Sequence, residues 1–302
     1  MKILLSDKSL RVKSPTFAAD PPAVRHTTVR KMDSEQAVDC RDWLAVEEPL
    51  EIRLNYVAKG RRQGKVVSIT MRTPGQDREL AAGFLFTEGI VRKPEEIARI
   101  YAAETPGQAV NQILIELAGD MEPDLPRLER RFFSSSSCGV CGKTTVESLD
   151  LDGMDIPAID SPKMNREILC HLPDALKKRQ AVFAQTGGLH AAALFSPGGE
   201  LLDLREDVGR HNALDKLIGA AFLEKRIPLS HCVLLLSGRV SFELMQKSVA
   251  AGIPFVAAVG APSSLAVDVA RRFQATLAGF LRGSRFNIYS GTRRIFSESV
   301  RG

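Results

Sequence analysis

Apolar and polar residues alternate along the early part of the chain, which is the pattern of half-buried β-strands. Residues 50–56 alternate strictly, and residues 66–71 form a second candidate strand that ends at the turn signal Pro74-Gly75. Residues 112–117 repeat the strand pattern. Three strands are therefore expected before residue 120.

Between these strands the apolar residues change to helical spacing. Residues 77–89 predict a helix, with Asp77 as its N-cap and Gly89 as its C-terminal stop. Residues 93–103 predict a second, shorter helix. Together with the strands, they predict a small α+β domain over residues 46–120.

The second half of the chain alternates short apolar segments with helical ones. Because its first strands follow one another before any helix, the sheet is expected to be mixed, and the later alternation predicts an α/β sandwich with helices on both faces. The expected strands cover residues 181–183, 191–195, 201–204, 232–236, 254–259, 276–280 and 286–289, and the expected helices residues 208–223, 241–251 and 264–273.

Two segments lack such periodicity. Residues 1–45 mix charges with prolines and are interpreted as a loose N-terminal lead-in. Residues 121–165 combine prolines, a basic cluster, four consecutive serines and an acidic stretch, which indicates a linker. The α/β domain then covers residues 166–302.

Composition and charge narrow the class of protein. The hydrophobic content of 44% is normal for a globular protein, and no apolar run approaches the length of a membrane span. The N-terminus lacks the apolar region of a signal peptide, so a soluble, cytoplasmic protein is expected. The net charge of +5 and the pI of about 9.0 suit an anionic partner without choosing one, and no aromatic-basic pattern indicates nucleic-acid binding.

The five cysteines do not form a disulfide framework, but two of them stand out. Cys138 and Cys141 lie three residues apart behind the serines, among glycines. A zinc site would need further ligands, a thioredoxin-like dithiol would need a helix N-terminus, and an incidental pair is also open. The favoured interpretation is a nucleophilic thiolate that accepts and passes on sulfur, with Lys143 favouring its charged form.

Three further segments could hold an anion. Residues 236–239 and 205–212 both lie where a strand leads into a helix, and the second is dense in charged groups. A tight turn and an ion-paired helix start are the structural alternatives. Residues 280–287 place a glycine and two arginines between two strands, which suits a phosphate but also a charged hairpin turn.

Five motifs in combination resemble the formate dehydrogenase accessory sulfurtransferase family (FdhD/NarQ), over residues 45–300. They are residues 78–89 (RELAAGFLFTEG), 137–142 (SCGVCG), 186–192 (TGGLHAA), 206–216 (EDVGRHNALDK) and 237–239 (SGR). The resemblance implies a sulfurtransferase that receives persulfide sulfur from a cysteine desulfurase on Cys138, with Cys141 in support. The sulfur would pass to the bis(molybdopterin guanine dinucleotide) molybdenum cofactor before this enters the formate dehydrogenase catalytic subunit.

The resemblance also implies a homodimer, no nucleic-acid or membrane partner, and a C-terminal domain similar to cytidine deaminase. Other residues occupy the positions of the deaminase zinc signature, so no zinc is expected. We hypothesise that a guanine nucleotide such as GDP binds where deaminases hold their zinc. The expected cofactor-binding residues are Phe280, Leu281, Arg282, Gly283, Ser284, Arg285, Arg239, Gly238, His211 and Arg210.

Two other functions compete with the sulfur carrier. A chaperone would hold the cofactor for formate dehydrogenase without chemistry, and would not need thiols in the serine-rich loop. A zinc-dependent hydrolase is the more distant alternative.

Overall fold

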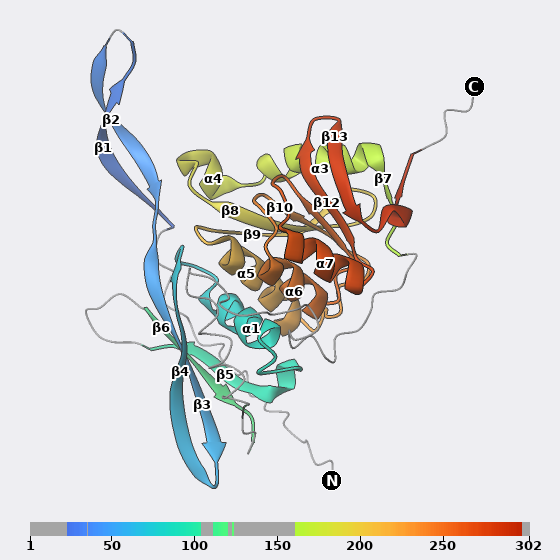
Figure 1. Cartoon of the computed structure of the whole chain (residues 1–302). Helices are drawn as coiled ribbons and strands as arrows, with labels where there is room; N and C mark the ends of the chain where they lie inside the picture. The colour runs from blue at the N-terminus through green and yellow to red at the C-terminus, as the bar shows by residue number, and fades with distance from the viewer. Residues whose placement is uncertain (1–22, 35, 104–110, 120–122, 124–160, 298–302) are drawn as a thin grey trace, which may run out of the picture.

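The computed structural model describes residues 23–34, 36–103, 111–119, 123 and 161–297. Cys138, Cys141 and most of the expected linker lie outside these residues. Two packed domains and a projecting hairpin make up the described part (Figure 1). Among the described residues, none of the helices has the length and apolar character needed to cross a membrane.

The N-terminal domain is a four-stranded sheet with one helix on it. The order of its strands is β4-β3-β6-β5, with β3 parallel to β6 and the other pairs antiparallel. Helix α1 packs on one face, where alternate residues of β3 are buried, so the predicted α+β character is confirmed. The elements are β3 (Glu48–Ala58), β4 (Arg61–Arg72), α1 (Asp77–Thr87), β5 (Ile97–Ala102) and β6 (Gln112–Leu117).

Two predicted details of this domain are wrong. The N-cap of α1 is Gln76, at φ 55°, because the Asp77 carboxylate accepts hydrogen bonds from Arg72, with Nε at 2.9 Å. The predicted helix over residues 93–103 is only a 3₁₀ turn, Pro94–Glu96, followed by β5. Pairing with β6 supplies β5 with the hydrogen bonds that a helix would have made internally.

The expected lead-in contains regular structure that the sequence analysis missed. Strands β1 (Val24–Met32) and β2 (Ala37–Ala45) pair in continuous antiparallel register and form an arm that projects from the body (Figure 1). Most of its residues are exposed, so the strands lack the apolar alternation that identifies a half-buried strand.

The C-terminal domain contains a six-stranded mixed sheet in the order β13-β12-β11-β10-β8-β9. Strands β10, β11 and β12 are parallel, and the remaining pairs are antiparallel, which confirms the mixed sheet. The strands are β8 (His190–Phe195), β9 (Leu201–Asp207), β10 (Val233–Leu236), β11 (Phe255–Ala258), β12 (Thr276–Arg282) and β13 (Arg285–Ser290).

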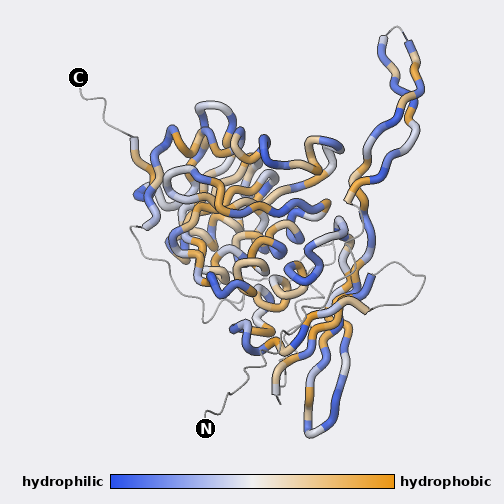
Figure 2. The backbone as a smooth tube through the Cα atoms, turned by 180° about the vertical axis from the view of Figure 1, so that it is seen from behind, coloured by the Kyte–Doolittle hydropathy of each residue, from blue (hydrophilic) through white to orange (hydrophobic). Residues whose placement is uncertain are grey.

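Helices cover both faces of this sheet, as predicted. Ala192 and Leu194 of β8 face α5 (Arg210–Leu223), α6 (Phe242–Ala250) and α7 (Ser264–Arg272). The intervening residues Ala191, Ala193 and Phe195 face α3 (Arg166–Lys177). Hydrophobic residues accordingly concentrate inside the body, while hydrophilic ones follow the outer ends of the hairpins (Figure 2).

The segment before β8 differs from its prediction. Residues 181–183 were expected as a strand, but they belong to helix α4 (Ala181–Thr186). The carboxylate of Glu206 accepts hydrogen bonds from the backbone N–H groups of Val182 and Phe183, at 3.1 and 2.9 Å. This contact satisfies backbone N–H groups in the first turn of α4 from strand β9.

A short parallel pairing of β7 (Met164–Asn165) with β14 (Ile295–Phe296) completes the sheets.

The two domains join where α1 crosses α5, and the backbones touch there. A Cβ atom on Gly83 would lie 1.9 Å from the carbonyl oxygen of Asp215, and one on Gly219 would lie 1.8 Å from that of Glu79. Both distances are far below any real contact. Only glycine at both positions lets the helices approach this closely.

Buried ion pairs hold the same joint. The Lys216 ammonium lies 2.7 Å from the Asp207 carboxylate, both side chains are fully buried, and Lys216 also donates to the carbonyl of Thr73. Asp207 accepts a further bond from the backbone N–H of Thr73, in the N-terminal domain. In a second pair, Lys247 of α6 lies 3.0 Å from the carboxylate of Asp215.

Replacing Gly83 or Gly219 by alanine should force α1 and α5 apart. We expect each substitution to lower the free energy of unfolding by about 3 kcal/mol or more, since the added methyl meets backbone atoms that cannot rotate away. Urea unfolding measures the change. Gly198→Ala is the control, because its Cβ would meet only an ordinary contact at 3.6 Å. Equal stability of Gly219→Ala and Gly198→Ala would contradict this account of the joint.

Lys216→Ala should leave the Asp207 carboxylate buried without its cation. We expect a loss of about 3–5 kcal/mol in the free energy of unfolding. Lys225→Ala provides the comparison, since the Lys225–Glu95 pair is exposed (67% and 60%) and its loss should change the free energy of unfolding far less. Similar losses in the two variants would show that burial does not govern the Asp207–Lys216 pair.

Candidate functional site

The carboxyl ends of the parallel strands meet at one edge of the C-terminal sheet, the place where open α/β sheets bind ligands. Hydrogen bonds connect these ends laterally. The backbone N–H of Gly260, after β11, donates to the carbonyl of Gly238, after β10, at 3.1 Å. The N–H of Phe280 in β12 donates to the carbonyl of Gly260, also at 3.1 Å. This edge is therefore a continuous strip of backbone.

Glycines make the strip compact. A Cβ on Gly260 would lie 2.8 Å from the carbonyl carbon and oxygen of Gly238, and one on Gly279 would lie 3.1 Å from the carbonyl oxygen of Gly260. Larger residues would separate the strand ends. Phe280, Gly238 and the start of α6 are thus held together by close backbone contact rather than by side chains.

Beyond β10 the strip continues to β8, which runs antiparallel to β10 and starts at this edge. The Ser237 hydroxyl accepts a hydrogen bond from the backbone N–H of Ala191 at 2.8 Å. The imidazole of His190 packs against Gly238, where a Cβ would approach its Nδ1 to 3.1 Å. Arg239 is exposed and precedes Ser241, the N-cap of α6. Gly238 and Arg239 therefore lie where they were expected to bind an anion.

The charged segment over residues 205–212 serves mainly structural purposes. Arg205 donates to Glu79 of α1, with Nε at 2.6 Å, and Glu206 caps α4. Asp207 accepts hydrogen bonds from the backbone N–H of Gly209 and from the side chain of Asn212. Because these groups are engaged within the protein, the interpretation of the whole segment as a ligand site is too broad.

Arg210 and His211, at the start of α5, remain as candidates, but they differ in their partners. His211 Nε2 lies 3.0 Å from the Glu243 carboxylate and 3.1 Å from the Ser241 hydroxyl, which connects α5 to α6. The hydrogen bond from His211 is the main reason that the pKa of Glu243 is lowered. In contrast, Nε of Arg210 is buried and has no hydrogen-bond partner among the described residues.

The hairpin after β12 carries the other expected cofactor-binding residues. Phe280 is 43% exposed and adopts φ 57°, a left-handed conformation that is a genuine outlier for a bulky residue. Leu281 is 1% exposed and packs in the core, so its side chain is unavailable to a ligand. Arg282 and Arg285 pair across the exposed turn of Gly283 and Ser284. Neither guanidinium forms an ion pair within the part of the chain that the structure describes.

The structure thus places most of the expected residues along one edge. Neighbouring strands lie about 4.8 Å apart, so Gly238 and Phe280, two strands apart, are separated by about 10 Å. His190 belongs to the same strip but had no assigned role. Its position two residues after Thr186-Gly187-Gly188, at the start of an apolar strand, was the available signal.

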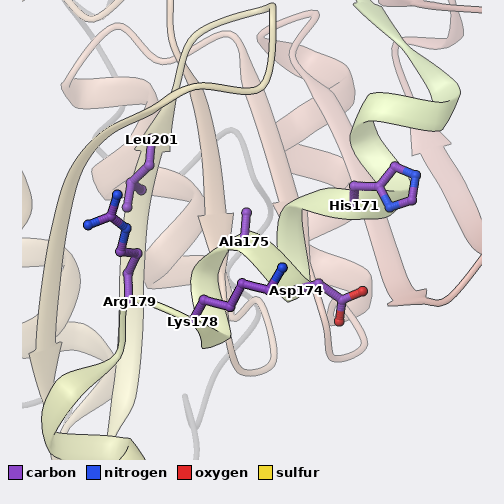
Figure 3. A pocket seen from close by; sticks show the side chains of 6 residues that line it. All are labelled: His171, Asp174, Ala175, Lys178, Arg179 and Leu201. Carbon is purple, nitrogen blue, oxygen red and sulfur yellow. The ribbon is translucent and has the colours of Figure 1, made fainter.

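Two hollows indent the described surface, and the larger of them does not coincide with this edge. One, of about 500 Å³, lies beside α3 and is lined by His171, Asp174, Ala175, Lys178, Arg179 and Leu201 (Figure 3). Since Leu201 begins β9, this pocket is at the end of the strand opposite to Asp207. A smaller crevice of about 190 Å³ lies between the domains, with Thr73 and Glu206 in its lining.

Several known proteins that share one name are similar to this chain over most of its length. The sulfur carrier protein FdhD of Streptomyces coelicolor is 49% identical over 279 residues, which cover 90% of this chain and 95% of that protein. The FdhD proteins of Mycobacterium tuberculosis (45% identity; 90% and 99% covered) and Saccharolobus solfataricus (41%; 90% and 98%) are also similar.

The fold is shared with a solved structure, that of a provisionally assigned formate dehydrogenase accessory protein from Desulfotalea psychrophila. The TM-score is 0.67 at 24% identity, covering 91% of this chain and all of that one. A profile of the FdhD/NarQ family matches residues 45–296. By this match and these relatives, the chain belongs to the FdhD/NarQ family.

Proposed function

We propose that this protein is a sulfur carrier in the maturation of formate dehydrogenase. The names of its relatives, which are 41–49% identical over most of the chain, support a sulfur carrier. The observation that carries the cofactor-binding half of the proposal is the alignment of Gly238, Arg210 and Phe280 along one sheet edge. The sulfur-binding half rests on the Cys138–Cys141 pair of the sequence.

The first step is transfer of sulfur to Cys138. Its thiolate attacks the terminal sulfur of a persulfide on a cysteine desulfurase, the S–S bond of the donor breaks, and the donor cysteine leaves as a thiolate. Cys138 then carries the persulfide, and no net oxidation has occurred. The Cys141 thiolate then attacks the Sγ of Cys138, the S–S bond of the persulfide breaks, and a Cys138–Cys141 disulfide forms. The terminal sulfur leaves, reduced to sulfide, to the molybdenum of the bis(molybdopterin guanine dinucleotide) cofactor, the substrate of this carrier, and a cellular thiol afterwards reduces the disulfide.

The sheet edge would hold the guanine nucleotide ends of that substrate. Backbone N–H groups and the positive end of a helix dipole favour phosphate at the start of α6, beside Arg239. Arg282 and Arg285, on the exposed turn, can pair with further phosphate oxygens. Phe280 offers an exposed aromatic face for a base, which explains why its strained backbone is tolerated.

Incubation with a cysteine desulfurase and cysteine should add one sulfur, about 32 Da, to the wild-type protein but not to Cys138→Ala. Intact-protein mass spectrometry measures the gain. Cys170→Ala is the matched control and should still gain sulfur, because burial raises the pKa of the Cys170 thiol and makes it a poor nucleophile. A gain that persists in Cys138→Ala but is absent in Cys141→Ala would show that Cys141, and not Cys138, accepts the sulfur. No gain in wild type with an active donor would favour the cofactor chaperone.

Phe280→Ala should weaken the binding of GDP roughly 10-fold, since one stacked base contributes about 1–3 kcal/mol. Binding of inorganic pyrophosphate, which has no base, should be unchanged. Isothermal titration calorimetry measures both. Phe296→Ala, which removes a phenylalanine of similar exposure (45%) on β14, is the control. Equal GDP affinity in wild type and Phe280→Ala would remove Phe280 from the site.

A further inference from the structure

The excess positive charge of the chain is concentrated in the hairpin of β3 and β4. Residues 52–76 contain six arginines and lysines and no aspartate or glutamate. Since this segment contributes +6 and the whole chain carries +5, all remaining residues together sum to −1. Two of the six cations are neutralised within the domain, because Arg53 pairs with Glu51 and Arg72 with Asp77. The other four are not buried in this way.

These four cations, Lys59, Arg61, Arg62 and Lys65, lie at the tip of the hairpin, which extends beyond the rest of the sheet (Figure 1). Lys59 and Gly60 form its two-residue turn, both at positive φ (53° and 71°), as in the tight turns that twisted hairpins prefer. Lys59, Arg61 and Arg62 are exposed, and none of the three forms an ion pair or a side-chain hydrogen bond with a described residue. Regular backbone structure thus presents unneutralised charge to solvent.

Strand β4 is also the edge strand of its sheet. Among the described residues it pairs with β3 and with no other strand. Ile69 is 67% exposed, and its partner across β3 is Glu51, which lies between the buried residues Leu50 and Ile52. Its side chain therefore points away from α1, on the same face as Val66 (36% exposed). An edge strand with exposed apolar side chains can accept a further strand.

Charges on an edge strand often serve only to prevent aggregation, and the β1–β2 arm shows what that looks like. The arm also exposes apolar side chains, such as Met32 (73%) and Val38 (55%). However, residues 24–45 contain four basic and four acidic residues, so the arm has no net charge. A surface of mixed sign selects no partner, whereas a surface of one sign selects a partner of the opposite sign.

We propose that the outer edge of β4 binds an acidic, extended segment of another protein, which pairs with β4 as a fifth strand of the N-terminal sheet. Carboxylates of the segment pair with Arg61 and Arg62, and its apolar side chains lie beside Val66 and Ile69. A nucleic acid is a poorer fit, because β4 has no aromatic residue on which a base could stack. This surface takes no part in the proposed sulfur transfer, so the inference does not depend on it.

The probe is a fluorescent peptide of about ten residues in which glutamate and valine alternate, titrated with the full-length protein and followed by anisotropy. We expect the double substitution Arg61→Glu with Arg62→Glu to weaken binding about tenfold or more. The matched control is Arg25→Glu with Lys31→Glu on the arm, which changes the net charge equally. Its affinity should change less than about twofold, since salt screens distant charges. Thermal unfolding checks that both variants are folded.

The apolar and backbone contacts are tested separately. Ile69→Ser should weaken binding several-fold but leave the dependence of affinity on salt unchanged, because it removes no charge. Hydrogen exchange measured by mass spectrometry should slow across β4 when the peptide binds, since an added strand accepts hydrogen bonds from backbone N–H groups on its outer edge. Exchange in residues 24–45 should stay the same.

Four outcomes would overturn the inference. Equal losses in the two charge-reversed variants would show that net charge alone governs binding. Peptide binding without slower exchange in β4 would exclude strand addition. Tighter binding of a duplex DNA oligonucleotide than of the peptide, lost on reversing Arg61 and Arg62, would identify a nucleic-acid surface. A change in the sedimentation coefficient of that variant in the absence of peptide would show that the edge pairs with a second copy of this chain.

Discussion

Helices α1 and α5 touch backbone to backbone at Gly83 and Gly219, and this contact fixes how the two domains sit on one another. The apolar cores continue across it. Phe222 of α5 belongs to the core of the N-terminal domain, and Phe86 of α1 packs against the core of the C-terminal domain. Helix α5 is thus common to both domains. Since α5 starts at the sheet edge, the joint also fixes the positions of Arg210 and His211.

Asp207 connects this joint to the candidate site. Burying a carboxylate is expensive unless its oxygens are fully satisfied, and here Lys216, the backbone N–H groups of Thr73 and Gly209, and the Asn212 amide do so. The same group therefore anchors the end of β9, the start of α5 and the neighbouring domain. Support of this kind would hold the donors of a candidate site in fixed positions for a ligand.

The edge itself combines two unusual features on a regular sheet. Close glycine contacts at positions 238, 260 and 279 bring the strand ends together, and they leave Phe280 exposed in a strained conformation. His190 remains unpaired in the described structure between a helix start and a glycine. Backbone strain such as that of Phe280 often lies at functional sites, which is one reason to favour this edge over the larger pocket beside α3 as the candidate site.

The sequence alone determined the class of fold, most strands and helices of the C-terminal domain, and the family. Periodic apolar patterns such as residues 208–223 identify buried helices, and motif spacing is visible without coordinates. The sequence alone did not predict the structure of short or exposed segments. Residues 181–186 became a helix because Glu206 caps it, and residues 24–45 paired with each other although few of their side chains are buried.

Only the tertiary structure decided which polar residues are free to bind. Asp207 and Arg205 looked like ligand groups in the sequence, but their partners, Thr73 and Glu79, lie 134 and 126 positions away along the chain. Likewise, the sequence made His211 a candidate ligand residue, and only the structure shows its contact with Glu243. A hydrogen bond satisfies a side chain regardless of sequence separation, so the availability of each group depends on the whole fold.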